Sequence, residues 1–246
     1  MLRPRIIPCI LIDSDDVVKT VNFNNNIYIG DPLNTVRLFN EKKSDEILII
    51  DISATRDKKK PNFKLIENIA EVARMPVAYG GGIKNKSDAL KIFSSGIEKI
   101  SVSSLFFENI TEVKNILKAV GSQSLVVTVD IKKVENKYSV FLNNGKKFVS
   151  NDLIGLIKKI EDLELGEIII NNIDRDGTME GYDEKLIEIF YSNSSIPLTT
   201  LGGVGKHEHI QLSINKFGNI GYACGSYFIF KGPRKAVLIS YENKFK

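Results

Sequence analysis

The two halves of this 246-residue chain match each other at a constant spacing of 121 residues. The identical pairs, found without a gap in the alignment, are Glu46 and Glu167, Ile47 and Ile168, Leu65 and Leu186, Ile66 and Ile187, Pro76 and Pro197, Gly81 and Gly202, and Gly82 and Gly203. Chance alone is not expected to place so many matches in one register. The repeat therefore predicts a fold made of two similar halves.

Short apolar segments alternate with amphipathic segments along the whole chain. The eight predicted strands cover residues 5–12, 46–52, 76–79, 99–103, 125–130, 167–172, 197–201 and 220–224. Predicted helices cover residues 33–43, 63–74, 87–95, 111–120, 152–163, 183–191 and 207–215. Strands that are apolar on both faces are typical of parallel sheets covered by helices. The pattern predicts a single (β/α)8 TIM barrel domain over residues 1–246, built from two (β/α)4 halves; a doubly wound open sheet is the alternative.

The segment 132–150 is too long for an ordinary loop between a strand and a helix. Its alternation of apolar and polar residues around Asn143, Asn144 and Gly145 is typical of a β-hairpin. We therefore expect a hairpin inserted over the top of the barrel.

The composition excludes several classes of protein. With 43% hydrophobic residues and a net charge of +4, the chain has the balance of a folded domain, and no basic stripe with aromatic residues indicates nucleic-acid binding. No apolar run approaches the roughly 18 residues of a membrane span, and no signal peptide is recognisable. Cys9 and Cys224 are too few for a disulfide framework, and His207 and His209 point in different directions. We expect a cytoplasmic protein without a metal or other cofactor.

In a barrel of this kind, functional groups lie on the loops that follow the strands. Asp130 ends the fifth predicted strand, and Asp176 lies in the loop after the sixth. Carboxylates gathered at a barrel mouth are suited to general acid–base catalysis. Lys19, Asp51 and Asn171 are candidates for substrate binding, although Asp51 could instead cap a loop and a lone lysine such as Lys19 is more often solvated.

Glycine and serine residues follow the strands in two symmetric clusters. One comprises Gly81, Gly82, Ser103 and Ser104; the other comprises Gly202, Gly203, Gly225 and Ser226, with Gly177 in a neighbouring loop. Such residues let backbone N–H groups and hydroxyls approach a phosphate, although glycines also make tight turns without any ligand. Two clusters on opposite sides of the mouth predict a substrate with a phosphate at each end.

Four charged residues lie at the opposite, amino-terminal ends of the strands: Arg5, Glu46, Lys99 and Glu167. If they point inward, two cations and two anions alternate across the barrel floor, which is the arrangement that offsets the cost of charges in an interior. The alternative is four unrelated surface charges. We refer to these four residues as the floor ring.

Several segments resemble the cyclase subunit of imidazole glycerol phosphate synthase. They are RIIPC at 5–9, LIIDISAT at 48–55, YGGGI at 79–83, GSQSLVVTVD at 121–130, NNIDRDGTMEGYD at 171–183 and LGGVG at 201–205. The resemblance implies a barrel that pairs with a glutaminase subunit at its amino-terminal face. It implies that the floor ring gates ammonia, which crosses the interior to a bisphosphorylated substrate at the top. It also assigns the two glycine–serine clusters to the phosphates and a catalytic role to Asp130.

One position departs from the pattern of that family. The family has a second catalytic aspartate on the first strand, where this chain has Leu11. Asp13 points to the same side as residue 11 but lies roughly 6–7 Å further along the strand. It could act as the second acid or base only if the loop bends back. Leu201 and Ser103 also replace residues usual in the family, a serine and an asparagine.

The altered mouth and the intact floor ring lead to three hypotheses. The first is a paralogue that takes ammonia from a glutaminase and supplies it to a further enzyme, a sugar amidotransferase of surface-polysaccharide biosynthesis. The second is an ordinary cyclase of histidine biosynthesis, a lyase that uses Asp130 and Asp13. The third is a scaffold that docks the glutaminase without catalysis.

Overall fold

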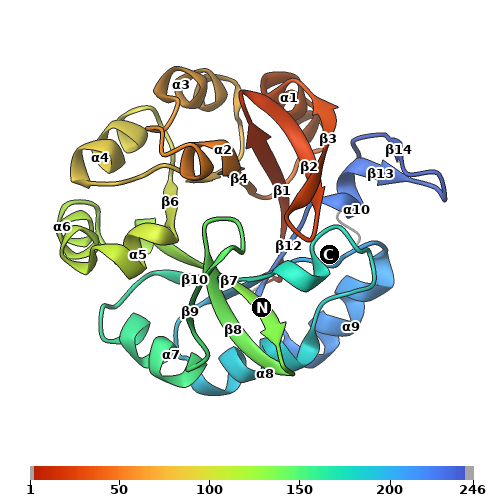
Figure 1. Ribbon diagram of the computed structural model, residues 1–246. Helices are drawn as coiled ribbons and strands as arrows, with labels where there is room; N and C mark the ends of the chain where they lie inside the picture. Colours follow the sequence, from red (N-terminus) through yellow and green to blue (C-terminus); the bar gives the residue numbers. More distant parts are fainter. Residues whose placement is uncertain (1–2, 242–246) are drawn as a thin grey trace.

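The computed structural model describes residues 3–241 and contains a closed barrel of parallel strands (Figure 1). The barrel strands are β1 (Arg5–Asp13), β4 (Ile47–Asp51), β5 (Val77–Gly80), β6 (Lys99–Val102), β7 (Leu125–Val134), β10 (Glu167–Asn172), β11 (Leu198–Leu201) and β12 (Gly221–Cys224). Each pairs in parallel with its neighbours, and the pairings of β1 with β12 and of β7 with β10 complete the circle. The predicted TIM barrel is confirmed, and an open sheet is excluded because the barrel has no free edge.

Helices surround the barrel on its outside (Figure 1). The longer ones are α1 (Pro32–Glu41), α3 (Phe63–Val72), α4 (Lys86–Ser94), α6 (Ile110–Val120), α7 (Leu153–Glu161), α8 (Glu184–Asn193) and α9 (His207–Phe217). All of these except α9 begin after an Asp or Asn whose side chain accepts a hydrogen bond from the third helical N–H. This capping fixes where each helix starts, and the predicted helix ends agree with the observed ones to within two residues.

The alternation of side chains along the strands produces two hydrophobic clusters. The outer cluster fills the space between strands and helices and includes Ile6, Ile10 and Ile49. The inner cluster fills the barrel itself and consists of Ile7, Cys9, Leu11, Val18, Leu48, Ala78, Val126, Ile169, Leu201 and Ala223. Neighbouring residues of β1 belong to different clusters because successive side chains of a strand point to opposite faces.

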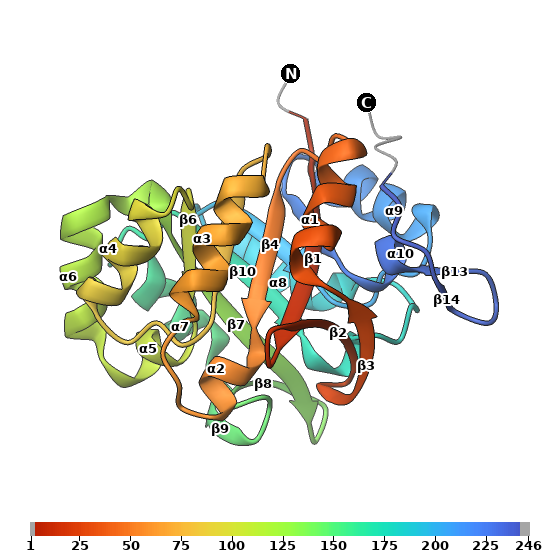
Figure 2. The ribbon, with the colours of Figure 1, turned by 90° about the horizontal axis from the view of Figure 1, so that it is seen from above.

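Two additions lie at the carboxyl-terminal end of the barrel, which is the end shown at the bottom of Figure 2. The first is an antiparallel hairpin of β2 (Asp16–Val21) and β3 (Asn24–Gly30), which extends β1 and was not predicted. Its turns use non-glycine residues with positive φ, Ser14 and Asp15 before β2 and Asn22 and Phe23 after it. Turns of this composition lack the glycine signal by which hairpins are recognised in a sequence.

The second addition occupies the segment 132–150. Here β7 continues beyond the barrel and pairs with β8 (Lys137–Leu142), which in turn pairs with β9 (Lys147–Ser150). The chain therefore makes two consecutive antiparallel turns. The first uses Glu135 and Asn136, both with positive φ, and the second contains the Asn143-Asn144-Gly145 sequence singled out above.

Short elements complete the described chain. They are α2 (Ile52–Arg56), α5 (Ser104–Glu108), α10 (Ser226–Ile229), β13 (Phe230–Lys231) and β14 (Ala236–Val237). After α10 the chain returns to the floor, where the Tyr241 hydroxyl donates a hydrogen bond to the Ile6 carbonyl oxygen at 3.2 Å.

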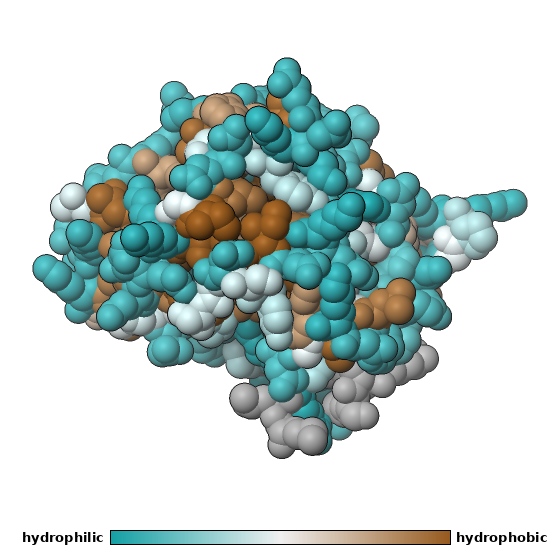
Figure 3. All heavy atoms as spheres, turned by 90° about the horizontal axis from the view of Figure 1, so that it is seen from below, coloured by the Kyte–Doolittle hydropathy of each residue, from teal (hydrophilic) through white to brown (hydrophobic). Residues whose placement is uncertain are grey.

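The outer surface is mostly hydrophilic, as Figure 3 shows for the side of the barrel on which α7 and α8 lie. A few apolar side chains are exposed on these elements and on β9, among them Phe148, Ile154 and Tyr191. None of the helices between residues 3 and 241 has both the length and the apolar character needed to cross a membrane.

Candidate functional site

A cavity of about 780 Å³ opens at the carboxyl-terminal end of the barrel, which we call the mouth. Strand ends and the loops that follow them form its walls, as expected for a barrel of this type. The predicted site residues that line it are Lys19, Asp51, Gly81, Gly82, Ser103, Ser104, Asp130, Asn171 and Asp176. These nine residues were predicted from the sequence, and they come from strands and loops far apart in the chain.

Asp130 lies on the cavity wall beside Asn171 of the neighbouring strand. The Asn171 side-chain Nδ2 donates a hydrogen bond to Asp130 Oδ1 at 2.8 Å. Burial raises the pKa of Asp130 to about 7; the bond from Asn171 acts against this shift, and the nearby negative charge of Asp176 adds to it. A carboxyl group with this pKa can both donate and accept a proton near neutral pH, which is what general acid–base catalysis requires.

Asp176 and Lys19 are positioned by the β2–β3 hairpin. Asp176 Oδ2 accepts hydrogen bonds from the Thr20 hydroxyl at 2.5 Å and from the Phe23 backbone N–H at 3.2 Å, and Lys19 Nζ lies 4.0 Å from Asp176 Oδ1. Lys19 is only 4% exposed. Its ammonium group occupies the space beside Gly225, where a Cβ atom would lie 2.6 Å from Nζ. Lys19 is therefore a buried cation in the mouth and not a solvated surface lysine.

The deepest part of the mouth cavity is apolar where the family pattern has a carboxylate. Leu11 and Leu201 both line the cavity, and both belong to the inner hydrophobic cluster. Each is 8% exposed. Asp130 therefore shares the cavity with two leucine side chains, and β1 provides no carboxylate at residue 11.

Asp13 is directed away from this apolar part of the mouth cavity. It ends β1 directly before the Ser14–Asp15 turn, and its two oxygens accept hydrogen bonds from Arg56 NH1 and NH2 at 2.8 and 2.9 Å. Asn26 also donates to it. The hydrogen bonds from Arg56 lower the pKa of Asp13. Asp13 is not among the residues that line the cavity, so the bend that would bring it beside Asp130 is absent from this loop.

Two further aspartates hold loops in place. Asp51 Oδ1 accepts hydrogen bonds from the Ser53 hydroxyl and from the Ala54 N–H at the start of α2, at 2.8 and 2.9 Å. Asp174 Oδ2 accepts a hydrogen bond from the Lys133 backbone N–H at 2.7 Å. For Asp51 this is the capping role that the sequence allowed as an alternative. Asp51 still contributes to the cavity wall.

The first glycine–serine cluster opens onto the cavity. Gly81 and Gly82 have φ values of +125° and +69°, and a Cβ on either would lie 2.8 Å or less from neighbouring atoms. Only glycine fits such a turn. Ser103 and Ser104 line the same wall, and their hydroxyls form no hydrogen bond within residues 3–241. The cluster therefore presents free donors to the cavity, as a phosphate site requires.

The second cluster does not line the cavity: of the described residues, none of Gly177, Gly202, Gly203, Gly225 and Ser226 is part of its wall. One hairpin turn covers the part of this cluster that contains Gly177. Asn22 donates to the Ile173 and Asp174 carbonyl oxygens at 3.1 and 2.8 Å, so the β2–β3 turn covers the Asp174–Gly177 loop.

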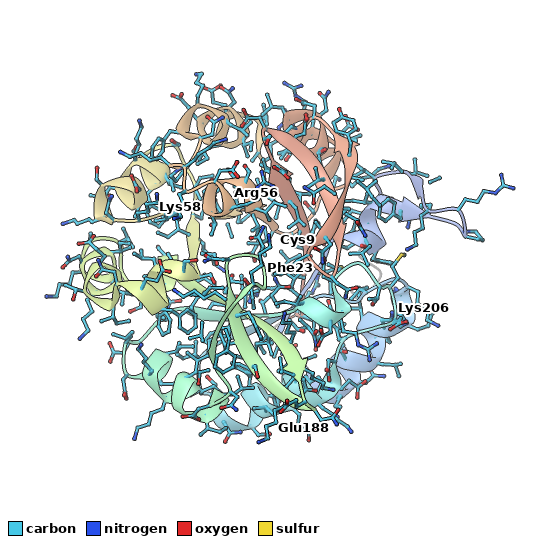
Figure 4. All side chains as sticks on the ribbon, in the orientation of Figure 1. Cys9, Phe23, Arg56, Lys58, Glu188 and Lys206 are labelled. Atoms are coloured by element: carbon cyan, nitrogen blue, oxygen red, sulfur yellow. The ribbon has the colours of Figure 1, made fainter. Side chains whose placement is uncertain are left out.

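The two hairpins also meet each other above the mouth. A Cβ built on Gly145 of the β8–β9 turn would lie 3.7 Å from the Phe23 ring and 3.3 Å from Ile173. Figure 4, a view along the barrel, shows Phe23 near the barrel axis. We call these two turns the roof. The roof lies over the Asp174–Gly177 loop, and the cavity below it extends from Gly81 and Ser103 to Lys19 and Leu201.

Several cavity residues were not found from the sequence. They are Thr20, Phe23, Arg56, Lys58, Lys84, Glu108, Asn143, Asn144, Lys146 and Lys147. All lie in loops, hairpins or short helices that follow strands. Their positions depend on how each loop folds back, and no local pattern in the sequence reports this.

At the opposite end of the barrel, the floor ring closes across the interior. Arg5 NH1 lies 3.1 Å from Glu46 Oε2, and Arg5 NH2 lies 2.6 Å from Glu167 Oε1. Lys99 Nζ lies 3.4 Å from Glu46 Oε1 and 3.0 Å from Glu167 Oε2. Each carboxylate thus bridges both cations, and the four residues form one alternating ring.

The ring is partly buried, and its charges depend on one another. The side chains of Arg5 and Lys99 are 33% and 27% exposed, whereas that of Glu167 is 7% exposed. Burial by itself would raise the pKa of Glu167, but the charges of Arg5 and Lys99 and the hydrogen bonds from Arg5 and Thr199 outweigh it and hold the pKa below its usual range. Gly221 leaves room for this arrangement, because a Cβ there would collide with Thr199 Oγ1.

A small cavity of about 10 Å³ lies directly above the ring. Its walls consist of Glu46, Lys99, Glu167 and Thr199 below and of the inner-cluster residues Ile7, Leu48, Ala78, Val126 and Ile169. A cavity of this size holds about one water-sized molecule. The barrel interior therefore begins with a charged floor and continues with an apolar lining.

Metal binding finds no support in the described part of the chain. Within residues 3–241, no three His, Cys, Asp or Glu side chains are grouped so that they could hold a metal ion. His209 instead accepts a hydrogen bond from the Gly205 N–H through Nδ1 at 3.3 Å.

Comparison with known proteins agrees with the geometry of the barrel. The family model for histidine biosynthesis proteins matches residues 5–232. A Leptospira borgpetersenii protein named "Putative imidazole glycerol phosphate synthase subunit HisF" is 49% identical over 245 residues, which are 99% of this chain and 96% of that protein. A Vibrio vulnificus protein named "Putative imidazole glycerol phosphate synthase subunit hisF3" is 44% identical over 99% of this chain and 94% of its own length.

The imidazole glycerol phosphate synthase subunit HisF of Sulfolobus acidocaldarius is 37% identical over 227 residues, which are 92% of this chain and 91% of that protein. The matches thus extend over nearly the full length of this chain and of each of these relatives. The chain belongs to the histidine biosynthesis protein family, together with the HisF cyclase subunits of imidazole glycerol phosphate synthase.

Proposed function

We propose that this chain is the cyclase-type subunit of a glutamine amidotransferase that resembles imidazole glycerol phosphate synthase. A glutaminase docks at the amino-terminal face of the barrel and releases ammonia there. The ammonia passes the floor ring and crosses the interior to the mouth, where an anionic ligand binds. The full-length similarity to HisF subunits supports this assignment at the level of the family.

The observation that carries the proposal is the layered interior of the barrel. The floor ring offers hydrogen-bond donors and acceptors to a polar molecule that enters from below, and the cavity above it has room for about one such molecule. The apolar side chains beyond this cavity disfavour an ion, so they favour the passage of neutral ammonia over ammonium.

We further propose that the ammonia is supplied to another enzyme, a sugar amidotransferase of surface-polysaccharide biosynthesis, and that cyclisation is lost. Cyclisation in the family uses two carboxylates, and here Leu11 stands at one of the two positions. Asp13 is bound to Arg56 and has a lowered pKa, which makes it a poor proton donor at neutral pH. Asp130 therefore acts without a partner on β1.

Ammonia transfer can be tested with the barrel and its glutaminase together. Glutamine-dependent amination of the acceptor should fall strongly in Lys99→Met, whereas amination with added ammonium salt should remain. The matched control is Lys118→Met, which replaces an exposed lysine on α6. Equal losses with glutamine and with ammonium salt would show that the ring does not conduct ammonia.

Loss of cyclisation can be tested in a histidine auxotroph that lacks its own cyclase subunit. The proposal predicts no growth when this gene is supplied, with or without its glutaminase. Robust growth would contradict it and support the ordinary cyclase of histidine biosynthesis, a lyase for which the raised pKa of Asp130 is the favourable observation. In that case Asp13→Asn should abolish turnover of the bisphosphate.

The scaffold hypothesis makes a different prediction. A scaffold docks the glutaminase but does not contribute to amination, so the Asp130→Asn variant should leave glutamine-dependent amination by the acceptor enzyme unchanged. The part-buried Asp130–Asn171 pair on the wall of an open cavity favours a chemical or binding role instead.

A further inference from the structure

Thr199 lies beside the floor ring, at the upper end of the barrel in Figure 2, and was not singled out from the sequence. It is the second residue of β11, pairs with Ile169 of β10 and with Gly221 of β12, and is only 1% exposed. Because side chains alternate along a strand, Thr199 points into the barrel with Leu201, whereas Leu198 packs in the outer cluster. Its hydroxyl is therefore a neutral polar group inside the barrel, next to four charges.

The Thr199 hydroxyl binds both members of one ion pair of the ring. It donates its hydrogen to Glu167 Oε1, and its oxygen accepts a hydrogen bond from Arg5 NH2 at 3.2 Å. Arg5 NH2 also donates to the same Glu167 Oε1 at 2.6 Å, and NH1 donates to Oε2 at 3.3 Å. A hydroxyl can donate and accept at once, so it closes a triangle with the cation and the carboxylate. The Arg5–Glu167 pair is thus held from a third side.

Gly221 makes this arrangement possible. A Cβ at this position would collide with the Thr199 hydroxyl and would lie 3.0 Å from Arg5 NH2. The residue paired with Thr199 on the neighbouring strand must therefore lack a side chain, so that the hydroxyl can reach both of its partners. Thr199 and Gly221 form one structural unit for this reason.

The other half of the ring has no such hydroxyl. Ala78 is the counterpart of Thr199 in the 121-residue repeat, and it is paired with Lys99 of the neighbouring strand. Ala78 cannot form a side-chain hydrogen bond, and among the described residues Glu46 accepts side-chain hydrogen bonds only from the two cations of the ring. The contact between Lys99 and Glu46 is also the longest of the four ion pairs, at 3.4 Å. The ring is thus held on one side only.

The small cavity above the ring adjoins Lys99 and not Arg5. Glu46, Lys99, Glu167 and Thr199 contribute to its wall, whereas Arg5 does not. In a ring that is fixed at Arg5, the contacts of Lys99 are the ones left to open toward this cavity. Arg5 then keeps its positive charge beside the opening, where it repels ammonium and leaves neutral ammonia unaffected.

We propose that Thr199 is a positioning residue of the floor ring, because its hydroxyl holds Arg5 and Glu167 together. The ring then opens at the contacts of Lys99. The inference rests on the proposed passage of ammonia through the ring, and it adds which part of the ring stays fixed while the molecule passes.

The test measures how fast phenylglyoxal, which reacts with arginine guanidinium groups, modifies Arg5 in the barrel without a glutaminase. The Arg5 side chain is 33% exposed, yet modification should be slow because both terminal nitrogens are held. Thr199→Val removes the hydroxyl at nearly constant volume and should speed the modification about tenfold, the effect expected when a charged group loses a hydrogen bond. Thr199→Ser keeps the hydroxyl and should retain the slow rate. Mass spectrometry of peptides reports the rate at each arginine.

The matched control is Thr200→Val, which makes the same change at the next residue of β11. Thr200 is also buried, at 3% exposed, but it points to the opposite face of the strand. Arg37, exposed on α1, is an internal reference whose rate should be the same in every variant. If Thr199→Val does not fold, the smaller change Thr199→Ala removes the same hydroxyl and should have the same effect on Arg5.

A second reagent locates the part of the ring that opens. The side chains of Arg5 and Lys99 have similar exposed fractions, 33% and 27%. In the parent barrel, acetic anhydride should modify Lys99 at a rate closer to that of the exposed Lys118 than the phenylglyoxal rate of Arg5 is to that of Arg37. Equal protection of Arg5 and Lys99 would overturn the assignment of the opening to Lys99.

Three outcomes would overturn the role of the hydroxyl. They are an equal rate for Arg5 in Thr199→Val and in the parent, an equal effect of Thr200→Val, and a fast rate in Thr199→Ser, which would make packing of the methyl group the cause. These measurements contain neither glutaminase nor ammonia, so their failure would leave the ammonia proposal intact. Conversely, failure of the Lys99→Met amination test would remove conduction and leave the hold on Arg5 in place.

Discussion

The floor and the mouth of this barrel both contain charged residues, but they are built differently. At the floor, two cations and two anions come from the first positions of barrel strands and neutralise each other completely. At the mouth, Asp130 has no ion partner within 4 Å in the described chain, Leu11 and Leu201 replace polar groups, and Lys58, Lys84 and Lys146 form no salt bridge with another described residue. A neutral ring suits the passage of a small neutral molecule, whereas an unbalanced mouth suits the binding of an anion.

The largest effect on stability is expected when a charge is placed in the apolar, deepest part of the mouth cavity. Leu11→Asp should lower the free energy of unfolding by about 3 kcal/mol, because a carboxylate would be buried among aliphatic side chains. Urea denaturation measures the change. The control Leu11→Met keeps the volume and should cost less than about 1.5 kcal/mol. If Leu11→Asp and Leu11→Met lowered the free energy of unfolding equally, this part of the mouth would tolerate a charge as the floor ring does.

The next effect is expected when the floor ring loses one charge. Glu167→Gln should lower the free energy of unfolding by about 2 kcal/mol, since Arg5 and Lys99 would then share a single carboxylate in a partly buried place. Glu188→Gln, on the outer surface of α8, is the control and should leave the denaturation midpoint unchanged. A ring variant that behaves like this control would show that the four charges act as independent surface groups.

A smaller, pH-dependent effect is expected at Asp130. Its pKa of about 7 lies above that of an unfolded aspartate, so the folded state holds the proton more tightly and loses stability as the pH rises from about 4 to 7. Asp130→Asn should therefore be more stable than the parent at pH 8, by about 1–2 kcal/mol; this is less than the roughly 4 kcal/mol of the full shift, because Asp130 is only part-buried on the wall of an open cavity. Thermal melts at several pH values measure this gap. A gap that does not change with pH would mean that the carboxyl group titrates normally.

The smallest effect on stability is expected when the ion pair between Arg56 and Asp13, beside the β2–β3 hairpin, is removed. Arg56→Met should cost about 0.5–1 kcal/mol at pH 7, because the pair is partly exposed. The pKa of Asp13 is lowered by Arg56, so its contribution is present above the pKa of an unfolded aspartate and disappears as the pH falls through the lowered value. Arg37→Met, on α1, serves as the control in the same melts. A cost that persists at low pH would point to packing as its source.

The sequence alone determined the barrel, its strand positions and the floor ring. These follow from local rules: apolar segments of strand length, helices between them, and side chains that alternate along each strand. Arg5, Lys99 and Glu167 are first residues of their strands, and Glu46 directly precedes one, so a correct strand assignment already places the four at one end. The same logic placed Asp130 and Asn171 side by side at the other end.

Only the tertiary structure decided the shape of the mouth. The β2–β3 hairpin was not predicted, and the contacts of its turn with the Asp174–Gly177 loop and with Gly145 join segments more than 100 residues apart. One glycine–serine cluster lines the cavity and the other does not, although the two are symmetric in the sequence. Arg56, which binds Asp13, ends the short helix α2, and Lys58, Lys84 and Lys146 of the cavity wall lie on loops. Loop positions depend on long-range packing, and no periodicity along the chain encodes such packing.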